Sequence, residues 1–172
     1  GQPDSIAVSA DGRYAAIAIE NQRDEDLNDG ELPQLPAGNL TIVDLVGAPA
    51  AWTTRVVALT GLASAFEPSD PEVEFVDISA TNVAAATLQE NNAVALVDLA
   101  TGTVLDDFSA GVSEHLADTR DDRAISLTDP LSEEREPDAI GWTADGNLAV
   151  ANEGDLRGGS RDWTIFTPAG YI

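Results

Sequence analysis

Acid–amide pairs recur along the chain where short apolar segments end, and their side chains are the ones best suited to chemistry. The pairs are Glu20-Asn21, Glu90-Asn91 and Asn152-Glu153, the last followed by Asp155. Carboxylate and amide oxygens are the hard ligands that Ca²⁺ prefers. At matching places in successive units, these side chains are predicted to line one site for a cation or a polar ligand. The alternative reading is that they cap strand ends and bond neighbouring loops.

A second candidate calcium site is the acidic segment 24–31, which alternates Asp with Asn ahead of a glycine. Asp24 and Asp26 are its candidate ligands. The segment departs from an EF-hand, because Gly30 falls one place late and Leu35 stands where a bidentate Glu belongs. A calcium loop and a solvated acidic loop both remain open.

Two further side chains have chemical potential. Arg157 is a candidate ligand-binding residue because a guanidinium binds phosphate bidentately, although pairing with a local carboxylate is the alternative. His115, the only histidine, follows Glu114 and lies near several aspartates. It could act as a general base or a metal ligand. No Ser or Cys nucleophile motif accompanies it, so catalysis by His115 is the weaker alternative, and no catalytic residue is assigned.

The charge of the chain excludes several partners. Eight basic residues, all Arg, face 31 acidic ones, for a formal net charge of -23. Binding to nucleic acid or to an anionic membrane surface requires basic groups, so both are disfavoured. There is no apolar run of membrane-spanning length, which predicts no membrane insertion. The absence of Cys excludes disulfides and thiolate metal sites.

An internal repeat predicts the elements that position these residues. Three openings, each Pro followed by an acidic residue, precede short apolar strands, and further strands follow them with Gly- and Asp-containing turns. The openings are Pro3-Asp4, Pro71-Glu72 and Pro137-Asp138; second strands are expected at 13–19, 83–88 and 147–151, third strands at 38–45, 92–99 and 162–166, and fourth strands at 54–59 and 103–108. Four antiparallel strands per unit are typical of β-propeller blades. A β-sandwich need not repeat its sequence, so it is the weaker alternative.

The repeat predicts an all-β chain with about three blades of a larger, roughly seven-bladed propeller. Blade one covers 1–60, blade two 61–111, an acidic inter-blade insertion 112–136, and blade three 137–172, which is cut at its fourth strand near Tyr171-Ile172. The expected partners are therefore the remaining blades, from the rest of a parent chain, a second fragment or another subunit. Trp52, Trp142 and Trp163 are spaced like residues that pack blades together.

Strand direction places the long acidic loops on one face of these blades and the tight turns on the other. The acidic loops span 20–38, 61–70, 112–136 and 153–161. Loops carry binding and catalytic residues more often than the elements that they connect. Any function is therefore expected on the face that carries Glu20, Glu90 and Glu153.

Several runs of residues resemble the choice-of-anchor I family of bacterial propellers. They are 2–14, the Leu-Gln-Glu-Asn-Asn-Ala run at 88–93, 136–140, and the Ala-Asn-Glu-Gly-Asp-Leu-Arg run at 151–157. That family looks like the mesenchyme-specific cell-surface glycoproteins, and some members are named alkaline phosphatases or lie beside phytase-like propellers. The resemblance implies a secreted or surface-attached protein, extracellular or periplasmic. It maps no catalytic nucleophile onto this chain.

Two functions follow as expectations. The first is a noncatalytic surface module, stabilised by calcium, that serves adhesion, surface structure or ligand binding. The second is a calcium-dependent phosphomonoesterase, like an alkaline phosphatase or phytase, in which clustered carboxylates hold calcium ions that bind phosphate and activate water. Metal-dependent turnover that is lost on Glu90→Ala or Glu153→Ala would favour the enzyme.

Overall fold

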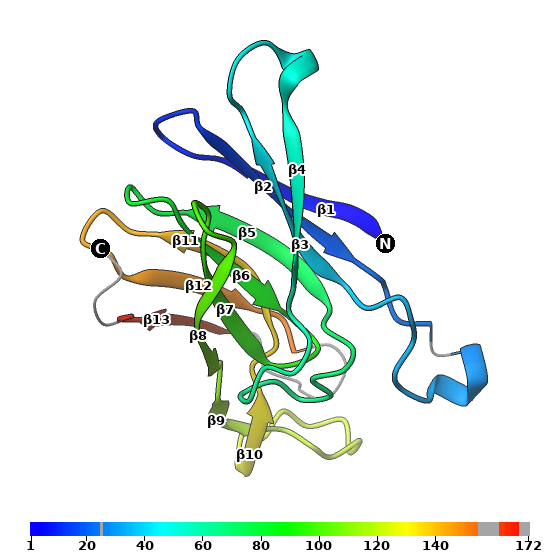
Figure 1. The fold of residues 1–172 in the computed structure, drawn as a ribbon. Helices are drawn as coiled ribbons and strands as arrows, with labels where there is room; N and C mark the ends of the chain where they lie inside the picture. The colour runs from blue at the N-terminus through cyan, green and yellow to red at the C-terminus, as the bar shows by residue number, and fades with distance from the viewer. Residues whose placement is uncertain (25, 155–161, 169–172) are drawn as a thin grey trace.

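The computed structural model describes residues 1–24, 26–154 and 162–168, and most of these residues lie in strands (Figure 1). Blade one is a four-stranded antiparallel meander, ordered β1-β2-β3-β4. Its strands are β1 (Gln2–Val8), β2 (Tyr14–Glu20), β3 (Asn39–Asp44) and β4 (Thr53–Ala58). Two short 3₁₀ helices, η1 (Leu27–Gly30) and η2 (Pro49–Ala51), lie in its connections.

Blades two and three repeat this arrangement. Blade two contains β5 (Val73–Ile78), β6 (Val83–Leu88), β7 (Ala93–Asp98) and β8 (Thr103–Ser109), and blade three contains β11 (Pro137–Trp142), β12 (Leu148–Asn152) and β13 (Asp162–Phe166). The prediction of an all-β fold with four-stranded antiparallel blades is confirmed. The expected start of a fourth strand in blade three, Tyr171-Ile172, lies outside the described residues.

The blades pack face to face, with blade two in the middle. Its inner strand β5 contacts both β1 and β11, as Figure 1 shows. One core, which includes Leu40, Ile42 and Leu88, joins blades one and two; a second, which includes Leu96 and Leu148, joins blades two and three. Because both faces of blade two are covered, every residue of β6 is buried. This explains why β6 reads as a continuous apolar run rather than an alternating one.

The acidic insertion forms an element that the sequence did not predict. Strands β9 (Val112–Ala117) and β10 (Asp129–Glu134) pair as a separate antiparallel hairpin. Charged residues interrupt the alternation on both strands, so the usual strand signal is missing. His115 lies on this hairpin, opposite Leu131. It is therefore an exposed residue of a projecting hairpin.

The tryptophans divide into different environments. Trp142 packs against the core between blades two and three, as expected. Trp52 lies beside η2 in the connection between β3 and β4 and is 43% exposed, so its expected role in packing blades together was wrong. Trp163 is 74% exposed on β13. Among the described residues, no helix is long and apolar enough to cross a membrane.

Candidate functional site

The innermost strand of every blade carries a β-bulge at the same place. In blade one, Pro3 pairs with Ile19 and Ser5 pairs with Ala18, so Asp4 is the extra residue. In blade three, the shift between Pro137 and Ala139 makes Asp138 the extra residue. A β-bulge re-aims the side chain of its extra residue. An acidic side chain is therefore held at the same point of both inner strands.

Blade two supplies the third member. The shift in β5 falls between Val73, which pairs with Leu88, and Val76, which pairs with Ala86. Glu74 follows Val73 as Asp4 follows Pro3, so Glu74 is the equivalent acid. The sequence reading had matched Pro71-Glu72 with Pro3-Asp4, and the strand register moves that match by two residues. The error arose because proline, rather than strand pairing, was used to align the openings.

A second set of polar residues follows the second strands. The last paired residues of the second strands, Ile19, Leu88 and Asn152, are equivalent because they pair with equivalent inner-strand residues. Each is followed directly by a polar residue: Glu20, Gln89 and Glu153. Gln89, rather than Glu90, is thus the equivalent of Glu20 and Glu153. We call Asp4, Glu20, Glu74, Asp138 and Glu153 together the inner acidic cluster.

Amide side chains support this cluster. The Nε2 of Gln2 donates a hydrogen bond to Oε2 of Glu20 over 3.2 Å. With its amide nitrogen facing the carboxylate, Gln89 donates to both oxygens of Glu74. Glu20 is only 7% exposed. The cluster is thus partly withdrawn from water and braced by amides from β1 and from the turn after β6.

The crowding of carboxylates perturbs their titration. Burial, reinforced by the negative charges of Glu20 and Asp138, raises the pKa of Glu74 to about 8. Burial also raises the pKa of Asp138, and the charges of Glu153 and Asp4 act in the same direction. Both effects disfavour the ionised form. At neutral pH Glu74 therefore retains a proton, which relieves part of the repulsion between the inner strands.

A buried arginine, Arg23, lies between blades one and two. Arg23, from the loop between β2 and β3, has a side chain that is 4% exposed. Its guanidinium lies 3.0 Å from a carboxylate oxygen of Glu90, 3.5 Å from Glu72 and 3.6 Å from Asp70. It also donates to the backbone carbonyl oxygen of Asp70 over 3.0 Å. We call Arg23, Asp70, Glu72 and Glu90 the Arg23 cluster; it links blade one to blade two.

Glu72 is the most deeply placed acid of the Arg23 cluster. It is 1% exposed, and neither of its carboxylate oxygens makes a hydrogen bond. Burial raises its pKa to about 8, against the opposing charge of Arg23 and with the added repulsion of Glu90. Three carboxylates around a single guanidinium carry excess negative charge. A proton on Glu72 offsets part of it.

The amides predicted as metal ligands are largely occupied by structural bonds. Asn91 is fully buried: its amide donates to the carbonyl oxygens of Phe66 and Asp70, and its oxygen accepts from the backbone N–H of Glu72. The amide of Asn21 donates to the carbonyl oxygen of Gln34 over 2.8 Å. That of Asn152 donates to Asp162 over 2.7 Å. The amide nitrogens of these residues thus position loops, while the buried Oδ1 of Asn152 has no hydrogen-bond partner in the described part of the chain.

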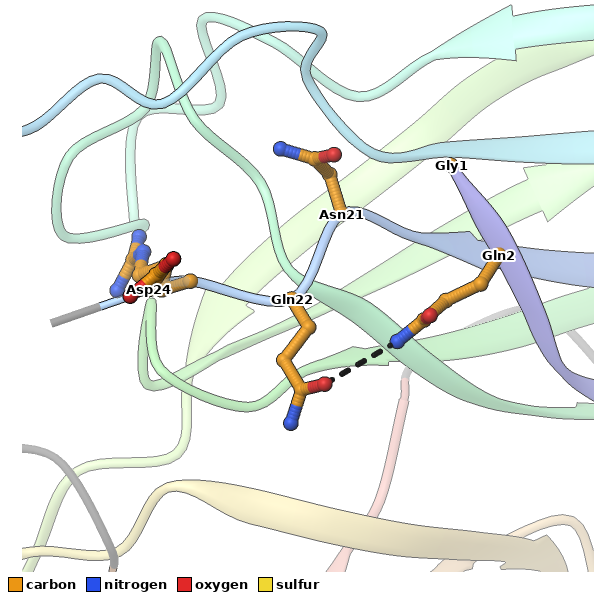
Figure 2. A pocket seen from close by; sticks show the side chains of 6 residues that line it. Gly1, Gln2, Asn21, Gln22 and Asp24 are labelled. Atoms are coloured by element: carbon orange, nitrogen blue, oxygen red, sulfur yellow. Dashed lines mark hydrogen bonds between the residues drawn. The ribbon is translucent and has the colours of Figure 1, made fainter. Parts of the chain in front are cut away.

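The start of the acidic loop borders a polar cavity of about 570 Å³, which Gln2 and Arg23 also line. Figure 2 shows its lining, in which Gln2 bonds Gln22 over 3.4 Å. Asp24 lines it, while Asp26 follows in the loop and donates its backbone N–H to Asp24 Oδ1. Both aspartates are exposed. Among the described residues, no group of three or more His, Cys, Asp or Glu side chains that could hold a metal ion combines them with Glu153. The remaining predicted residues, Asp155 and Arg157, lie outside the described residues.

Neither acidic group is a finished metal centre. Within residues 1–24, 26–154 and 162–168, no three His, Cys, Asp or Glu side chains are arranged as a metal-ion site. In the inner acidic cluster, amide side chains donate to Glu20 and Glu74, and Glu74 retains a proton at neutral pH. The cluster is a region of concentrated negative charge on the inner strands of the three blades.

Sequence reasoning missed the bulge acids and Arg23. The recurring acid at each opening was visible, but it was interpreted as the start of a strand rather than as a converging group. The convergence of these acids depends on the bulge, which is a feature of strand register. Nothing in the sequence around Arg23 indicates that its side chain is buried between acids of the next blade.

Comparison with known proteins places the chain in one family. Residues 1–168 match the model of the choice-of-anchor I domain. No curated protein matches the chain. Among solved structures, virginiamycin B lyase from Staphylococcus aureus is similar at 16% identity and a TM-score of 0.41, over 99% of this chain and 57% of that one. The Cps50 (Swd1) β-propeller domain of Myceliophteria thermophila is similar at 11% identity and a TM-score of 0.37, over 96% of this chain and 73% of that one.

Proposed function

The chain belongs to the choice-of-anchor I family, and from this premise we propose that it is part of a secreted or cell-surface propeller that binds a divalent cation. The binding site is the inner acidic cluster, and calcium is the first cation to test. The observation that carries the proposal is the acidic residue at the equivalent bulge of each blade, Asp4, Glu74 and Asp138.

Physical chemistry explains why such a site suits calcium. Adjacent carboxylates repel each other, and partial burial adds a desolvation cost to the charges of Glu74 and Asp138. A divalent cation offsets both effects, and Ca²⁺ accepts six to eight oxygen ligands in flexible geometry. Such flexibility tolerates donors that come from three separate strands. A bound ion would connect the inner strands of all three blades and stabilise their arrangement.

The proton on Glu74 predicts how binding depends on pH. Because the pKa of Glu74 is about 8, calcium must displace a proton at neutral pH. Affinity should therefore increase as pH rises towards 8, and binding should release protons. Extracellular calcium modules typically bind with dissociation constants of about 0.1–1 mM. That range suits a protein in extracellular or periplasmic surroundings.

The acidic loops on the same face are proposed to carry ligand binding or adhesion. A noncatalytic role is proposed first because the sequence carries no Ser or Cys nucleophile motif. Turnover of a chromogenic phosphate ester that requires calcium and Glu153 would replace this proposal by the hydrolase alternative.

Calorimetric calcium titration tests the proposal with matched variants. The test variant combines Asp4→Asn, Glu74→Gln and Asp138→Asn. The control combines Asp106→Asn, Asp121→Asn and Glu114→Gln, which are exposed residues outside both clusters and remove the same number of carboxyl groups. We expect the control to bind like the wild type and the test variant to lose binding at least tenfold. Equal loss in both variants, or no binding at millimolar calcium, contradicts the proposal.

A further inference from the structure

The turns that join the first and second strands of the three blades share one hydrogen bond. In each turn, the backbone N–H of the fourth residue donates to the carbonyl oxygen of the first. The donors and acceptors are Gly12 and Ser9, Asn82 and Ser79, and Gly146 and Thr143. The fourth residues all have positive φ, of 68°, 64° and 81° in chain order. The third residues are therefore equivalent as well, and they are Asp11, Thr81 and Asp145.

A side-chain bridge joins the turns of blades one and two. The Nδ2 of Asn82 donates to Oδ2 of Asp11 over 2.9 Å, so the fourth residue of one turn bonds the third residue of the turn before it. Between blades two and three, the equivalent residues are Gly146 and Thr81. Glycine has no side chain that could donate, so this bridge is not repeated at the second junction.

A cleft lies at the second junction, where the bridge is not repeated. It has a volume of about 380 Å³, within the range of small-molecule pockets. Residues 79–81 of the blade-two turn form one wall, residues 143–146 of the blade-three turn form the other, and Trp142 also lines it. The described chain therefore supplies both walls of the cleft by itself.

Trp142 brings a hydrogen-bond donor to this cleft. Its Nε1 is shielded from solvent and has no hydrogen-bond partner among the described residues. Its backbone N–H donates to a carboxylate oxygen of Asp77 over 2.7 Å, which ties the end of β11 to blade two. A buried N–H group without an acceptor is destabilising, and the indole has no other polar group. A ligand oxygen bound in the cleft would supply the missing acceptor.

The blade-three turn brings an ionised acceptor and a small apolar surface. The carboxylate oxygens of Asp145 accept from the Thr143 hydroxyl over 2.6 Å and from the Asn147 amide over 3.0 Å. These bonds, that of Thr143 most of all, hold the pKa of Asp145 below its usual value. Each carboxylate oxygen has a second lone pair and can accept once more. Ala80 and Ala144, both exposed, add methyl groups on opposite walls.

We propose that this cleft binds the ring of a neutral pyranose sugar. The sugar hydroxyls donate to Asp145, a sugar oxygen accepts from the indole N–H of Trp142, and the C–H face of the ring lies on Ala80 and Ala144. An anion is disfavoured by Asp145 and by the net charge of -23. A purely apolar ligand would leave the indole N–H unpaired, and an ammonium or guanidinium group has no oxygen to accept from it.

The cleft is separate from the proposed cation site. Trp142 is the last residue of β11, whereas Asp138 of the inner acidic cluster is the second. Loss of calcium binding at the inner acidic cluster therefore leaves the sugar site untouched, and the two proposals fail independently.

NMR titration of the complete gene product tests the proposal through the indole N–H signals. The signal of Trp142 is the one that disappears in Trp142→Phe. The probes are methyl β-D-glucopyranoside, methyl β-D-galactopyranoside and methyl α-D-mannopyranoside, with glucuronate as the charged counterpart. We expect at least one methyl glycoside to move the Trp142 signal downfield with a dissociation constant of about 1–10 mM, and glucuronate to bind at least about tenfold more weakly. Tighter binding of a hexasaccharide of the preferred sugar assigns the site to a polysaccharide, and equal binding assigns it to a free sugar.

Two variants test the geometry, with the backbone N–H signal of Gly146 as the common readout. Trp142→Phe keeps an aromatic ring but removes the donor, so it should weaken binding at least about fivefold. Thr81→Asp combined with Gly146→Asn rebuilds the bridge of Asp11 and Asn82 across the cleft. Asparagine suits that backbone, because Asn82 itself has a φ of 64°. This bridged variant should lose binding without a lower melting temperature.

A matched control carries the same two changes elsewhere. Thr60→Asp with Gly61→Asn lies in an exposed turn, where Gly61 has the same φ of 81° as Gly146. This control should bind the sugar like the wild type. An unmoved Trp142 signal at about 50 mM of every methyl glycoside, well above the expected dissociation constant, overturns the proposal. Wild-type affinity in Trp142→Phe or in the bridged variant overturns it as well.

Discussion

Replacement of Arg23 by Gln tests the arrangement between blades one and two most sharply. The variant removes the guanidinium that lies within 3.6 Å of Asp70, Glu72 and Glu90, and the Arg23 side chain is 4% exposed. Removing one partner of a buried ion pair costs about 3–5 kcal/mol because the other charge stays buried and uncompensated. With a urea dependence of about 2 kcal/mol per molar, this loss lowers the urea midpoint by about 2 M.

Matched variants separate this effect from a general loss of charge. Arg120→Gln removes an arginine whose side chain is 62% exposed and which lies 3.2 Å from Asp129. An exposed pair contributes less than about 1 kcal/mol, so this control should barely move the midpoint. Adding Asp70→Asn to Arg23→Gln should recover part of the lost stability, since it removes one uncompensated acid. If Arg23→Gln and Arg120→Gln have equal midpoints, the Arg23 cluster does not hold the blades as described.

Three further perturbations follow from the same contacts. The pKa values of Glu72 and Glu74 are about 8 in the folded protein against a usual 4.5, so the folded state keeps protons that the unfolded chain releases. The free energy of unfolding should therefore fall between about pH 5 and 8, by up to about 1.4 kcal/mol per pH unit for Glu72 and by less for the partly exposed Glu74. Urea midpoints measured across this range should depend less on pH in Glu72→Gln than in the wild type. Asn91→Ala should cost at least about 2 kcal/mol in urea unfolding because buried carbonyls lose their donor. Asn147→Ala, whose amide donates to the exposed Asp145, should cost less than about 1 kcal/mol. Gly38→Ala should lower the melting temperature because a Cβ there would collide with the Pro71 carbonyl oxygen, and an unchanged melting temperature would contradict that close approach.

The blades could be predicted from the sequence because they rest on local signals. Third strands such as 93–98 combine an apolar run with a following turn at Thr101-Gly102, and the structure places β7 there. The β9–β10 hairpin escaped prediction because its strands carry charged residues on both faces. Its two strands pair because the insertion turns back on itself as a hairpin, and not because apolar residues alternate along them.

The candidate site was predicted only in part, because its geometry depends on register. Glu20 and Glu153 do belong to equivalent positions, but the two-residue error at Pro71 and the one-residue error at Glu90 concealed Glu74 and Gln89. A bulge adds one residue to one strand, and no residue type identifies that addition in a single sequence. The burial of Arg23 depends on contacts between blades and has no local signal at all.

The proposed cation site can be located directly by crystallography of the complete gene product. Crystals grown at pH 8 with calcium, and in parallel without it, should be compared in anomalous difference maps. The proposal predicts a calcium peak bounded by Asp4, Glu74 and Asp138 that is absent without calcium. A map with no peak at these carboxylates, or with calcium only in the loop of Asp24 and Asp26, would contradict it.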